Sequence, residues 1–305
     1  MRIFITGASG HIGSAVVPEL LGAGHQVTGL ARSERAAASL RAAGAEVLRS
    51  DLDDLPGLRA AAAASDGVIH LAFKHDLAFS GDFEGAAKAD LGAIEALGAG
   101  LEGSGKPLVG TSGTMQLASA IRGRAGTEDD VLESGRRVIA EHAVINLKSR
   151  GVRSSVVRLA PTVHSELDLQ GFIPTLIAMA KKNGFAAYVG DGANRWPALH
   201  TLDAARIYRL ALEAAPAGSR LHGAAEEGVR FRAIAEAIGR GLGLPARSIT
   251  AEEAPAILGF LSAFASADNP TSDARTRRLL NWEPSHPGLL ADLEEGHYFR
   301  SAAPK

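Results

Sequence analysis

Hydrophobic positions in the first half of the chain fall into short apolar runs that alternate with longer amphipathic stretches. The runs have the length and apolar composition of strands buried on both faces of a sheet, whereas the stretches repeat apolar residues at helical spacing. This pattern predicts strands at 2–6, 26–30, 46–48, 67–71, 107–111 and 152–159. It predicts helices at 11–23, 33–43, 55–64, 83–101 and 134–150.

Strands that alternate with helices are typical of right-handed βαβ units, so the pattern predicts an α/β fold with a doubly wound parallel sheet. The rhythm changes near residue 161, where helices are predicted at 172–182, 203–214, 230–241 and 287–299 and an apolar segment spans 257–267. We therefore expect a first domain at 1–160 and a mixed region at 161–305. The second region is expected to form a smaller lobe, with some of its segments returning to the sheet.

Three glycines spaced three residues apart follow the first predicted strand, at Gly7, Gly10 and Gly13. In such a turn the first glycine permits the sharp bend, the second lets backbone N–H groups approach a pyrophosphate, and the third lets the next helix pack closely. The start of that helix carries unpaired N–H groups and the positive end of the helix dipole, which attract phosphate. The sequence thus predicts a dinucleotide site at this turn, with further contacts from Ser9, His11 and Ile12. A turn with a purely structural role is the alternative.

Composition excludes several kinds of chemistry. The chain has 305 residues, of which 46% are hydrophobic and 22% charged, as is ordinary for a globular protein. A formal net charge of -2 provides no strong field for nucleic acid or anionic membranes, and the sequence has neither a signal-peptide pattern nor an apolar stretch of membrane-spanning length. The absence of cysteine excludes disulfides, thiolate nucleophiles and thiolate-bound zinc. We expect a cytoplasmic protein that binds neither nucleic acid nor membranes.

Arg32 lies just after the second predicted strand, where an acidic residue would accept hydrogen bonds from an adenosine ribose and repel a 2′-phosphate. A guanidinium instead offers a fork of donors suited to phosphate, so Arg32 favours NADP over NAD. Asp51 and Leu52 follow the third predicted strand, where a carboxylate can accept a hydrogen bond from the adenine amino group. Solvated surface positions are the alternative for Arg32 and Asp51.

Taken together, six segments of the chain resemble the extended and atypical short-chain dehydrogenase/reductases, the NAD(P)-dependent epimerase/dehydratase group. The order and spacing of the segments carry the resemblance, which covers most of the chain. The segments are 6–13 (TGASGHIG), 51–52 (DL), 68–72 (VIHLA), 109–112 (VGTS), 157–164 (VRLAPTVH) and 199–205 (LHTLDAA). The resemblance implies a Rossmann-type sheet, a smaller C-terminal substrate lobe and a nicotinamide cofactor.

In that family a Tyr-x-x-x-Lys pair on the helix after the fifth strand transfers the proton that accompanies hydride transfer. The tyrosines of this chain lie elsewhere, at Tyr188, Tyr208 and Tyr298. One alignment places Glu133 and Arg137 at the two positions of the pair, and a shift of two residues places Gly135 and Ile139 there. The resemblance therefore implies an active site without the usual acid/base pair.

Four residues are candidates for the chemistry of that pair. Ser112 aligns with the family's serine or threonine that hydrogen-bonds the substrate oxygen. Arg136 and Arg137 could hold the cofactor ribose or polarise a carbonyl, because a guanidinium stays charged at neutral pH. His75 follows the fourth predicted strand, and a histidine there could exchange a proton at physiological pH. A structural role is the alternative for each of them, and Glu133 is a further carboxylate that could titrate if it were buried.

The resemblance also assigns residues along the cofactor and the substrate. Chain segments after the fourth and sixth strands contact the nicotinamide half in the family, which implies contacts from Leu71, Ala72, Phe73, Pro161 and Val163. Substrate contacts are expected from Lys74, Met115, His164, Arg195 and Trp196. The sequence has no tight His-Glu-x-x-His spacing, so no metal site is expected.

The leading hypothesis is an NADP-dependent oxidoreductase that acts on a small carbonyl or hydroxyl compound. One alternative uses the nicotinamide transiently, as nucleotide-sugar epimerases and dehydratases do. The other alternative is a non-catalytic protein that senses the NADP(H) redox state. Family members often dimerise through the helices beside the active site, which implies a homodimer through segments 83–101 and 134–150.

Overall fold

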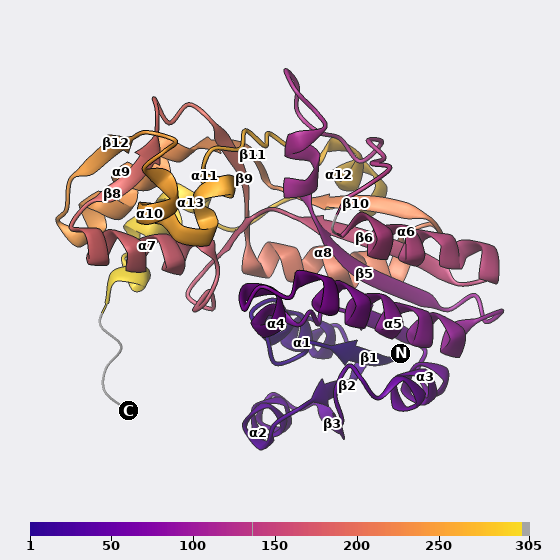
Figure 1. Ribbon diagram of the computed structural model, residues 1–305. Coiled ribbons are helices and arrows are strands. Elements are labelled where there is room, and N and C mark those ends of the chain that lie inside the picture. Colours follow the sequence, from indigo (N-terminus) through magenta and orange to yellow (C-terminus); the bar gives the residue numbers. More distant parts are fainter. Residues whose placement is uncertain (136, 301–305) are drawn as a thin grey trace.

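The computed structural model describes residues 1–135 and 137–300, which form two lobes side by side (Figure 1). Its strands are β1 (Arg2–Thr6), β2 (Gln26–Ala31), β3 (Glu46–Arg49), β4 (Gly67–His70), β5 (Pro107–Gly113), β6 (Arg153–Leu159), β7 (Thr162–His164), β8 (Ala186–Val189), β9 (Arg195–His200), β10 (Ser219–Gly223), β11 (Glu226–Arg230) and β12 (Ala246–Ile249).

The α-helices are α1 (Gly13–Gly22), α2 (Glu34–Ala42), α3 (Leu55–Ala64), α4 (His75–Phe79), α5 (Phe83–Leu101), α6 (Val138–Asn146), α7 (Phe172–Asn183), α8 (Thr201–Ala214), α9 (Phe231–Leu242), α10 (Ala254–Leu258), α11 (Ser262–Ala265), α12 (Ala274–Leu280) and α13 (Leu289–Glu294). Short 3-10 helices are η1 (Thr114–Ser119), η2 (Leu147–Arg150), η3 (Gly259–Leu261) and η4 (His297–Phe299). Among these described helices, none is both long and apolar enough to cross a membrane.

The larger lobe is built on a seven-stranded parallel sheet with the strand order β10-β6-β5-β4-β1-β2-β3. From β1 the chain first moves outward to β3 and then crosses back to β4 on the other side. The strand order therefore reverses beside β1, and the carboxyl ends of the strands there form the usual ligand-binding edge of such a sheet. The predicted α/β fold with a doubly wound parallel sheet is confirmed.

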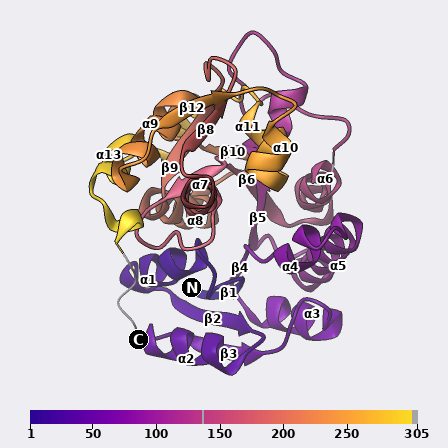
Figure 2. The ribbon, with the colours of Figure 1, turned by 60° about the vertical axis from the view of Figure 1, so that its left-hand side comes forward.

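Neighbouring residues of each central strand point into different cores, which explains why these strands are apolar throughout. Ile3 and Ile5 of β1 pack with α1 and α8, whereas Phe4 packs with α3 and α5. In β4, Ile69 packs in the core with α1 and α8, and Val68 packs in the core with α3 and α5. Figure 2 shows α1 and α8 on one side of the strands and α3, α5 and α6 on the other. A strand covered on both faces needs apolar residues at every position.

The smaller lobe holds its own apolar core between helices and two small sheets. One sheet has the order β11-β9-β7, and the other pairs β12 with β8. Helices α7, α9, α10 and α13 close around them, with α9, α10 and α13 drawn in orange to yellow in Figure 1. One segment of residues 161–305, β10, lies instead at the edge of the large sheet beside β6.

The structure differs from the sequence prediction where glycine interrupts an apolar pattern. Helix α6 begins at Val138 rather than at residue 134, because Gly135 has a φ of 152° that no helix accommodates. Its predicted end becomes the 3-10 helix η2. The apolar segment 257–267 is divided among α10, η3 and α11, since Gly259 has a φ of 51°. Gly296, with a φ of 78°, likewise separates α13 from η4.

Glu141 of α6 joins the helix to two strands at the edge of the large sheet. Its carboxylate accepts hydrogen bonds from Arg158 of β6 at 2.6 and 2.9 Å, and from Arg220 of β10 at 2.8 Å. Burial raises the pKa of a carboxyl, but here the hydrogen bonds from Arg158 and Arg220 outweigh it and leave the pKa of Glu141 below its ordinary value. Both Glu141 and Arg158 are buried, so removing either one would leave the charge of the other buried and uncompensated.

Replacing Glu141 with Gln should lower the free energy of unfolding by about 3–5 kcal/mol, because it leaves a buried guanidinium without a counter-ion. Urea unfolding followed by circular dichroism measures this loss. The variant Glu95→Gln is the control: it removes an exposed partner of Arg150 and should change stability by about 0–1 kcal/mol. If the two substitutions lowered the free energy of unfolding equally, the burial of Glu141 would contribute nothing to stability.

Candidate functional site

The glycine turn joins β1 to α1 and packs directly against the chain that leaves β4. Gly7 has a φ of 71°, and a Cβ on it would lie 2.7 Å from the backbone N of Ala72. A Cβ on Gly13 would overlap the carbonyl oxygen of Gly7. On Gly10, by contrast, a Cβ would have only that oxygen nearby, at 3.3 Å. Packing within the protein therefore requires Gly7 and Gly13, whereas the glycine at position 10 fits the close approach of a phosphate.

A hollow of about 320 Å³ lies at the carboxyl ends of β2 and β3. Two of its guanidinium groups have exposed carboxylate partners: Arg32 pairs with Asp76 at 2.9 Å, and Arg49 lies 3.8 Å from Glu34. Exposed pairs of this kind are weak, so an anion in the hollow can compete for both arginines. The lining residues are Ala31, Arg32, Arg49, Ser50, Asp51 and Asp54.

A buried chain of hydrogen bonds runs from the glycine turn beneath the end of β4. The Thr6 hydroxyl accepts a hydrogen bond from Ala72 N at 3.3 Å and lies 2.7 Å from Nδ1 of His70. Nε2 of His70 lies 3.0 Å from Oδ1 of Asp90, on α5. This network is satisfied when Thr6 donates to Nδ1 and Nε2 donates to the carboxylate, which is the arrangement of a neutral imidazole. The end of β4 is thereby fixed against both β1 and α5.

Arg137 continues this network at the amino end of α6. Its Nη2 donates to the carbonyl oxygen of Thr111 at 3.1 Å and lies 3.5 Å from Oδ2 of Asp90. Its guanidinium lies over the ring of Phe73, 4.3 Å from the ring centre. Nε of Arg137 is buried and has no hydrogen-bond partner within the described structure. The structure thus holds a cation at the carboxyl ends of β4 and β5, with donor capacity left over.

Ser112 lies at the carboxyl end of β5 and is held by a glutamine from the following 3-10 helix. Nε2 of Gln116 donates to Oγ of Ser112 at 2.7 Å. Oε1 of Gln116 is buried without a partner in the described structure, and a Cβ on Gly135 would lie 3.5 Å from it. Because the amide nitrogen donates to Ser112, the serine hydroxyl hydrogen is free to point to another acceptor.

His75 and Lys74 follow β4 at the start of α4. The His75 ring lies edge-on to Phe73, 5.1 Å between ring centres, on the same phenyl ring that Arg137 covers. Partial burial and the positive charge of Arg137 lower the pKa of His75 below its ordinary value. Nζ of Lys74 is bound by both carboxylate oxygens of Asp53, at 2.6 and 2.7 Å. His75 therefore lies with the β4 and β5 ends, whereas Lys74 is tied toward the loop after β3.

The chain after β6 passes through Pro161 and Val163 to His164 at the end of β7. Val163 packs in the core that contains the glycine-turn residue Ala8. His164 is fully buried, and its Nδ1 lies 2.9 Å from Oδ2 of Asp292 on α13. The predicted cofactor segment is thus next to the glycine turn, while His164 lies inside the protein between the two lobes.

Arg195 and Trp196, predicted to contact substrate, have partners within the smaller lobe. Trp196 is fully buried and its Nε1 donates to the carbonyl oxygen of Phe264 at 3.1 Å, so its ring packs in the lobe core. Arg195 forms a two-point pair with Asp268. Met115, on η1, packs against that same core. The sequence could not reveal these partners, which lie about 70 residues away along the chain.

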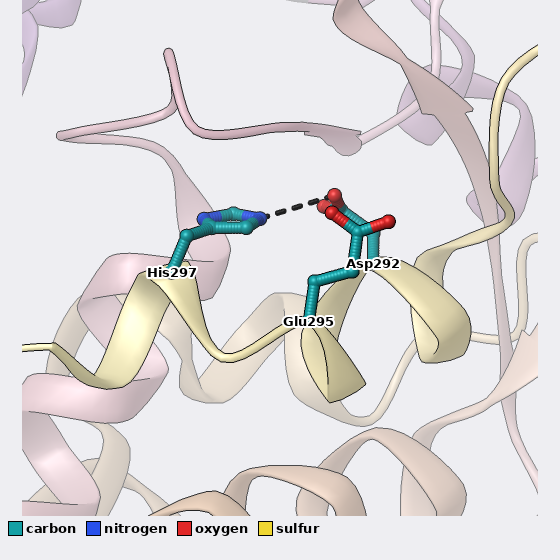
Figure 3. A group of neighbouring side chains, drawn as sticks. All are labelled: Asp292, Glu295 and His297. Atoms are coloured by element: carbon teal, nitrogen blue, oxygen red, sulfur yellow. Dashed lines mark hydrogen bonds and ion pairs between the residues drawn. The ribbon is translucent and has the colours of Figure 1, made fainter.

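Asp292, Glu295 and His297 form a group at α13 and η4 in which Asp292 is buried and Glu295 is exposed. Figure 3 shows the imidazole of His297 directed at Asp292. Their candidate ligand atoms lie within 4.8 Å of one another. Oδ1 of Asp292 already pairs with Nε2 of His297 at 3.0 Å, and Oδ2 pairs with His164. Both oxygens of this buried carboxylate are therefore used to join η4 and β7 to α13.

Comparison with known proteins gives the family. A profile described as the NAD dependent epimerase/dehydratase family matches residues 3–86, the segment with the glycine turn, the hollow and the end of β4. An uncharacterized protein of Schizosaccharomyces pombe is 46% identical over 98% of this chain and 100% of its own length. The chain belongs to the NAD-dependent epimerase/dehydratase family. A second uncharacterized relative, from Saccharomyces cerevisiae, is 41% identical over 97% of this chain and 99% of that protein.

The family fold extends over both lobes of the chain. The solved structure of DesIV, a dTDP-glucose 4,6-dehydratase from Streptomyces venezuelae with NAD and TYD bound, superposes with a TM-score of 0.78. The match covers 98% of this chain and 96% of that one, at 18% sequence identity. At such low identity the likeness concerns the arrangement of strands and helices.

Helix α6 of this family member, Val138–Asn146, contains neither tyrosine nor lysine. Tyr208 is fully buried on α8, its hydroxyl 2.8 Å from Thr111 Oγ1, and burial raises its pKa above the ordinary value. Glu133 is exposed ahead of the helix, Ile139 is exposed on it, and Arg136 lies outside the described residues.

Two residues with defined places in the site were missed as sequence candidates: Asp90 and Arg49. Asp90 lies at a helical position that pattern alone assigns to an exposed or half-buried face, and only the fold brings it under His70. Arg49 ends β3 opposite Ala31, the last residue of β2, and Arg32 comes next, so the parallel pairing of those strands was the signal that could have found Arg49.

Gly10→Ala and Gly13→Ala should separate binding from folding at the glycine turn. The first should preserve stability and weaken dinucleotide binding at least about 10-fold, because only a ligand needs the space above Gly10. The second should destabilise the protein by about 1–3 kcal/mol, since a methyl group there forces the backbone apart. Thermal unfolding and calorimetric titration with NADP measure the two effects, and loss of stability in both variants would contradict the assignment.

Proposed function

We propose that this protein is an NADP-dependent oxidoreductase that acts on a small carbonyl or hydroxyl compound. The observation that carries the proposal is that Ser112 lies at the carboxyl end of β5 and that Arg137 binds the carbonyl oxygen of the preceding residue, Thr111. Ser112 offers a hydroxyl hydrogen, and Arg137 offers a fixed positive charge. Both suit an oxygen on which negative charge develops during reduction.

The residues present fit a nicotinamide dinucleotide. The amino end of α1 presents backbone N–H groups over Gly10, which suit a pyrophosphate, and the hollow beside β2 has the place of an adenosine half. Leu71, Ala72 and Phe73 lead from the turn toward Arg137, the course expected for the nicotinamide half. When bound, the nicotinamide would supply the hydride chemistry, and the chain's own residues would orient the substrate and manage the proton.

Two arginines at the hollow favour a 2′-phosphate over a free ribose hydroxyl. Arg32 and Arg49 end neighbouring parallel strands, and both guanidinium groups are exposed. A phosphate between them could form charge-assisted hydrogen bonds to both. The two guanidinium groups would have to outweigh the negative charge of Asp54, whose carboxylate caps α3 through Gly57 N and accepts the Ser50 hydroxyl.

Arg32→Ala and Arg49→Ala should each weaken NADP binding by about 5- to 20-fold and leave NAD binding nearly unchanged, because each removes one charge-assisted contact to the 2′-phosphate. Calorimetric titration with both dinucleotides measures the ratio. Arg41→Ala, which removes a partner of Glu34 outside the hollow, serves as the control. An equal loss for NAD and NADP would contradict 2′-phosphate recognition.

The proton would pass through a group other than a guanidinium, because arginine stays protonated in proteins. His75 suits this role by position, since it shares the Phe73 ring with Arg137. Its lowered pKa leaves it neutral at pH 7, so it is prepared to accept a proton from a hydroxyl substrate. In the direction of reduction, water or the small protonated fraction of His75 would donate.

Ser112→Ala should lower kcat/KM for carbonyl reduction by about 100-fold without changing NADPH affinity, since it removes one donor to the reacting oxygen. Arg137→Ala should lower kcat/KM for carbonyl reduction by at least the same factor. NADPH oxidation in the presence of a panel of small aldehydes and ketones gives the rates. Ser119→Ala, which changes an exposed serine on the 3-10 helix η1 that follows β5, is the control. Tight NADPH binding without oxidation by any compound would favour a redox sensor, and unchanged turnover in Ser112→Ala would remove the serine from the mechanism.

A further inference from the structure

Polar and ionisable side chains gather where the glycine turn meets the smaller lobe. Five of the chain's ten histidines lie there, together with three aspartates. Their pairs connect the amino end of α1 with β7, α8, α13 and η4. The residues are His11, His164, His200, His286, His297, Asp168, Asp203 and Asp292.

His11 is the member of this cluster that belongs to the dinucleotide site. It lies between Gly10 and Ile12 in the glycine turn, and its side chain extends toward the smaller lobe. Nε2 lies 2.8 Å from Oγ1 of Thr201, whose hydroxyl donates to the carbonyl oxygen of His164. Thr201 therefore accepts from Nε2, which carries a hydrogen. Nδ1, the nitrogen that can gain or lose a proton, lies 3.7 Å from Oδ1 of Asp168.

Asp168 is a buried carboxyl that faces this nitrogen. Its Oδ1 accepts a hydrogen bond from Gly171 N at 2.7 Å, and its Oδ2 accepts one from the hydroxyl of Tyr298 at 3.2 Å. Burial raises the pKa of Asp168 to about 6 and, with a smaller effect from His164, lowers the pKa of His11 to about 4. Near pH 7 the pair without ligand therefore holds an ionised carboxylate beside a neutral imidazole.

The surrounding groups leave Asp168 ionised and His11 neutral in the protein without ligand. Nδ1 of His164 pairs with Asp292, and Asp292 also pairs with His297, so these three groups are partnered with one another. Tyr298 donates to Asp168 while accepting from Ser165 N, and burial raises the pKa of its hydroxyl well above the ordinary value. The remaining titratable groups near the pair are His200, Asp203, His286 and Glu295.

We propose that Asp168 is a positioning residue for the dinucleotide that acts through His11: the pair takes up one proton as the pyrophosphate settles on the glycine turn, and Asp168 and Thr201 then hold the imidazolium beside the phosphates. The inference rests on the proposed dinucleotide site. A pyrophosphate at the amino end of α1 would bring two negative charges next to residue 11. Those charges raise the pKa values of nearby titratable groups, and the effect is strong here because the region is partly buried and has a low dielectric constant.

The sign of the pH dependence follows from that uptake. The complex binds more protons than the free protein between pH 6 and the higher pKa of the bound pair, so affinity must rise as the pH falls through that range. Well above the bound pKa neither state is protonated, and affinity stays at its lower limit. Below the pKa values of the free pair both states carry the protons, and affinity reaches its upper limit.

Calorimetric titration with NAD tests the proposal, because the pyrophosphate of NAD is fully ionised from pH 6 to 8, whereas the 2′-phosphate of NADP itself titrates near pH 6. Titrations in two buffers of different ionisation enthalpy count the protons. We expect uptake of about 0.5–1 proton at pH 7 and an affinity that falls about 10-fold between pH 6 and 8. Asp168→Asn should keep the hydrogen bond from Gly171 N and reverse the one with Tyr298, because Nδ2 would donate to the tyrosine oxygen. It should reduce uptake below about 0.2 proton and flatten the pH profile.

Two further variants distinguish proton uptake from a structural effect. Asp168→Glu should restore part of the uptake, because it returns the titrating group. Asp273→Asn is the matched control: Asp273 is another buried carboxyl with a raised pKa, but it pairs with Arg277 at the start of α12, and its loss should leave uptake unchanged. Dinucleotide binding without proton uptake, or an unchanged pH dependence of affinity in Asp168→Asn, would overturn this proposal. Either result would leave the proposed dinucleotide site in place. Absence of binding by both NAD and NADP would overturn both.

Discussion

The close approach of the glycine turn to the end of β4 is the constraint on which the rest of the site depends. Gly7 brings the turn within contact of Ala72, and Gly13 lets α1 start directly against the same turn. Thr6 then reaches both Ala72 and His70, and Asp90 fixes the far side of that imidazole. A side chain at Gly7 would push the turn away from Leu71 and Ala72, the residues that lead to Phe73, and a side chain at Gly13 would push α1 away from the turn.

Buried charges connect this edge of the sheet to the remainder of the protein. Glu141 holds α6 against β6 and β10, which places the start of α6, and so Arg137, beside β5. On the other side, His11 and Thr201 join the glycine turn to α8. Buried polar groups are costly unless they are satisfied, so these contacts specify one arrangement of the two lobes as well as contributing to stability.

Much of the fold was predictable from the sequence, because strands covered on both faces and amphipathic helices leave direct patterns. Helices α3 and α5 have the predicted bounds, and β1 begins and ends as expected. The exceptions share a cause: Gly135, Gly259 and Gly296 interrupt apolar patterns through backbone conformation that hydropathy does not record. In the site, the candidates came from residues near a motif, whereas Asp90 has no motif around it and meets His70 only through the fold. Trp196 shows the converse, since an aromatic residue predicted beside substrate packs inside the lobe.

In the family a tyrosine and a lysine on one helix combine two tasks, and under the proposed function this chain would divide those tasks between separate elements. A positive charge is supplied ahead of α6 by Arg137, which is anchored by a backbone carbonyl and a buried carboxylate. A guanidinium can hold an oxygen but cannot exchange a proton at neutral pH. Exchange would then require a separate group, and His75 is placed for it because the same phenyl ring contacts both side chains. Burial and the positive charge of Arg137 both lower the pKa of His75. Arg137, which would stabilise a developing oxyanion, therefore also helps to keep the His75 imidazole neutral and ready to accept a proton.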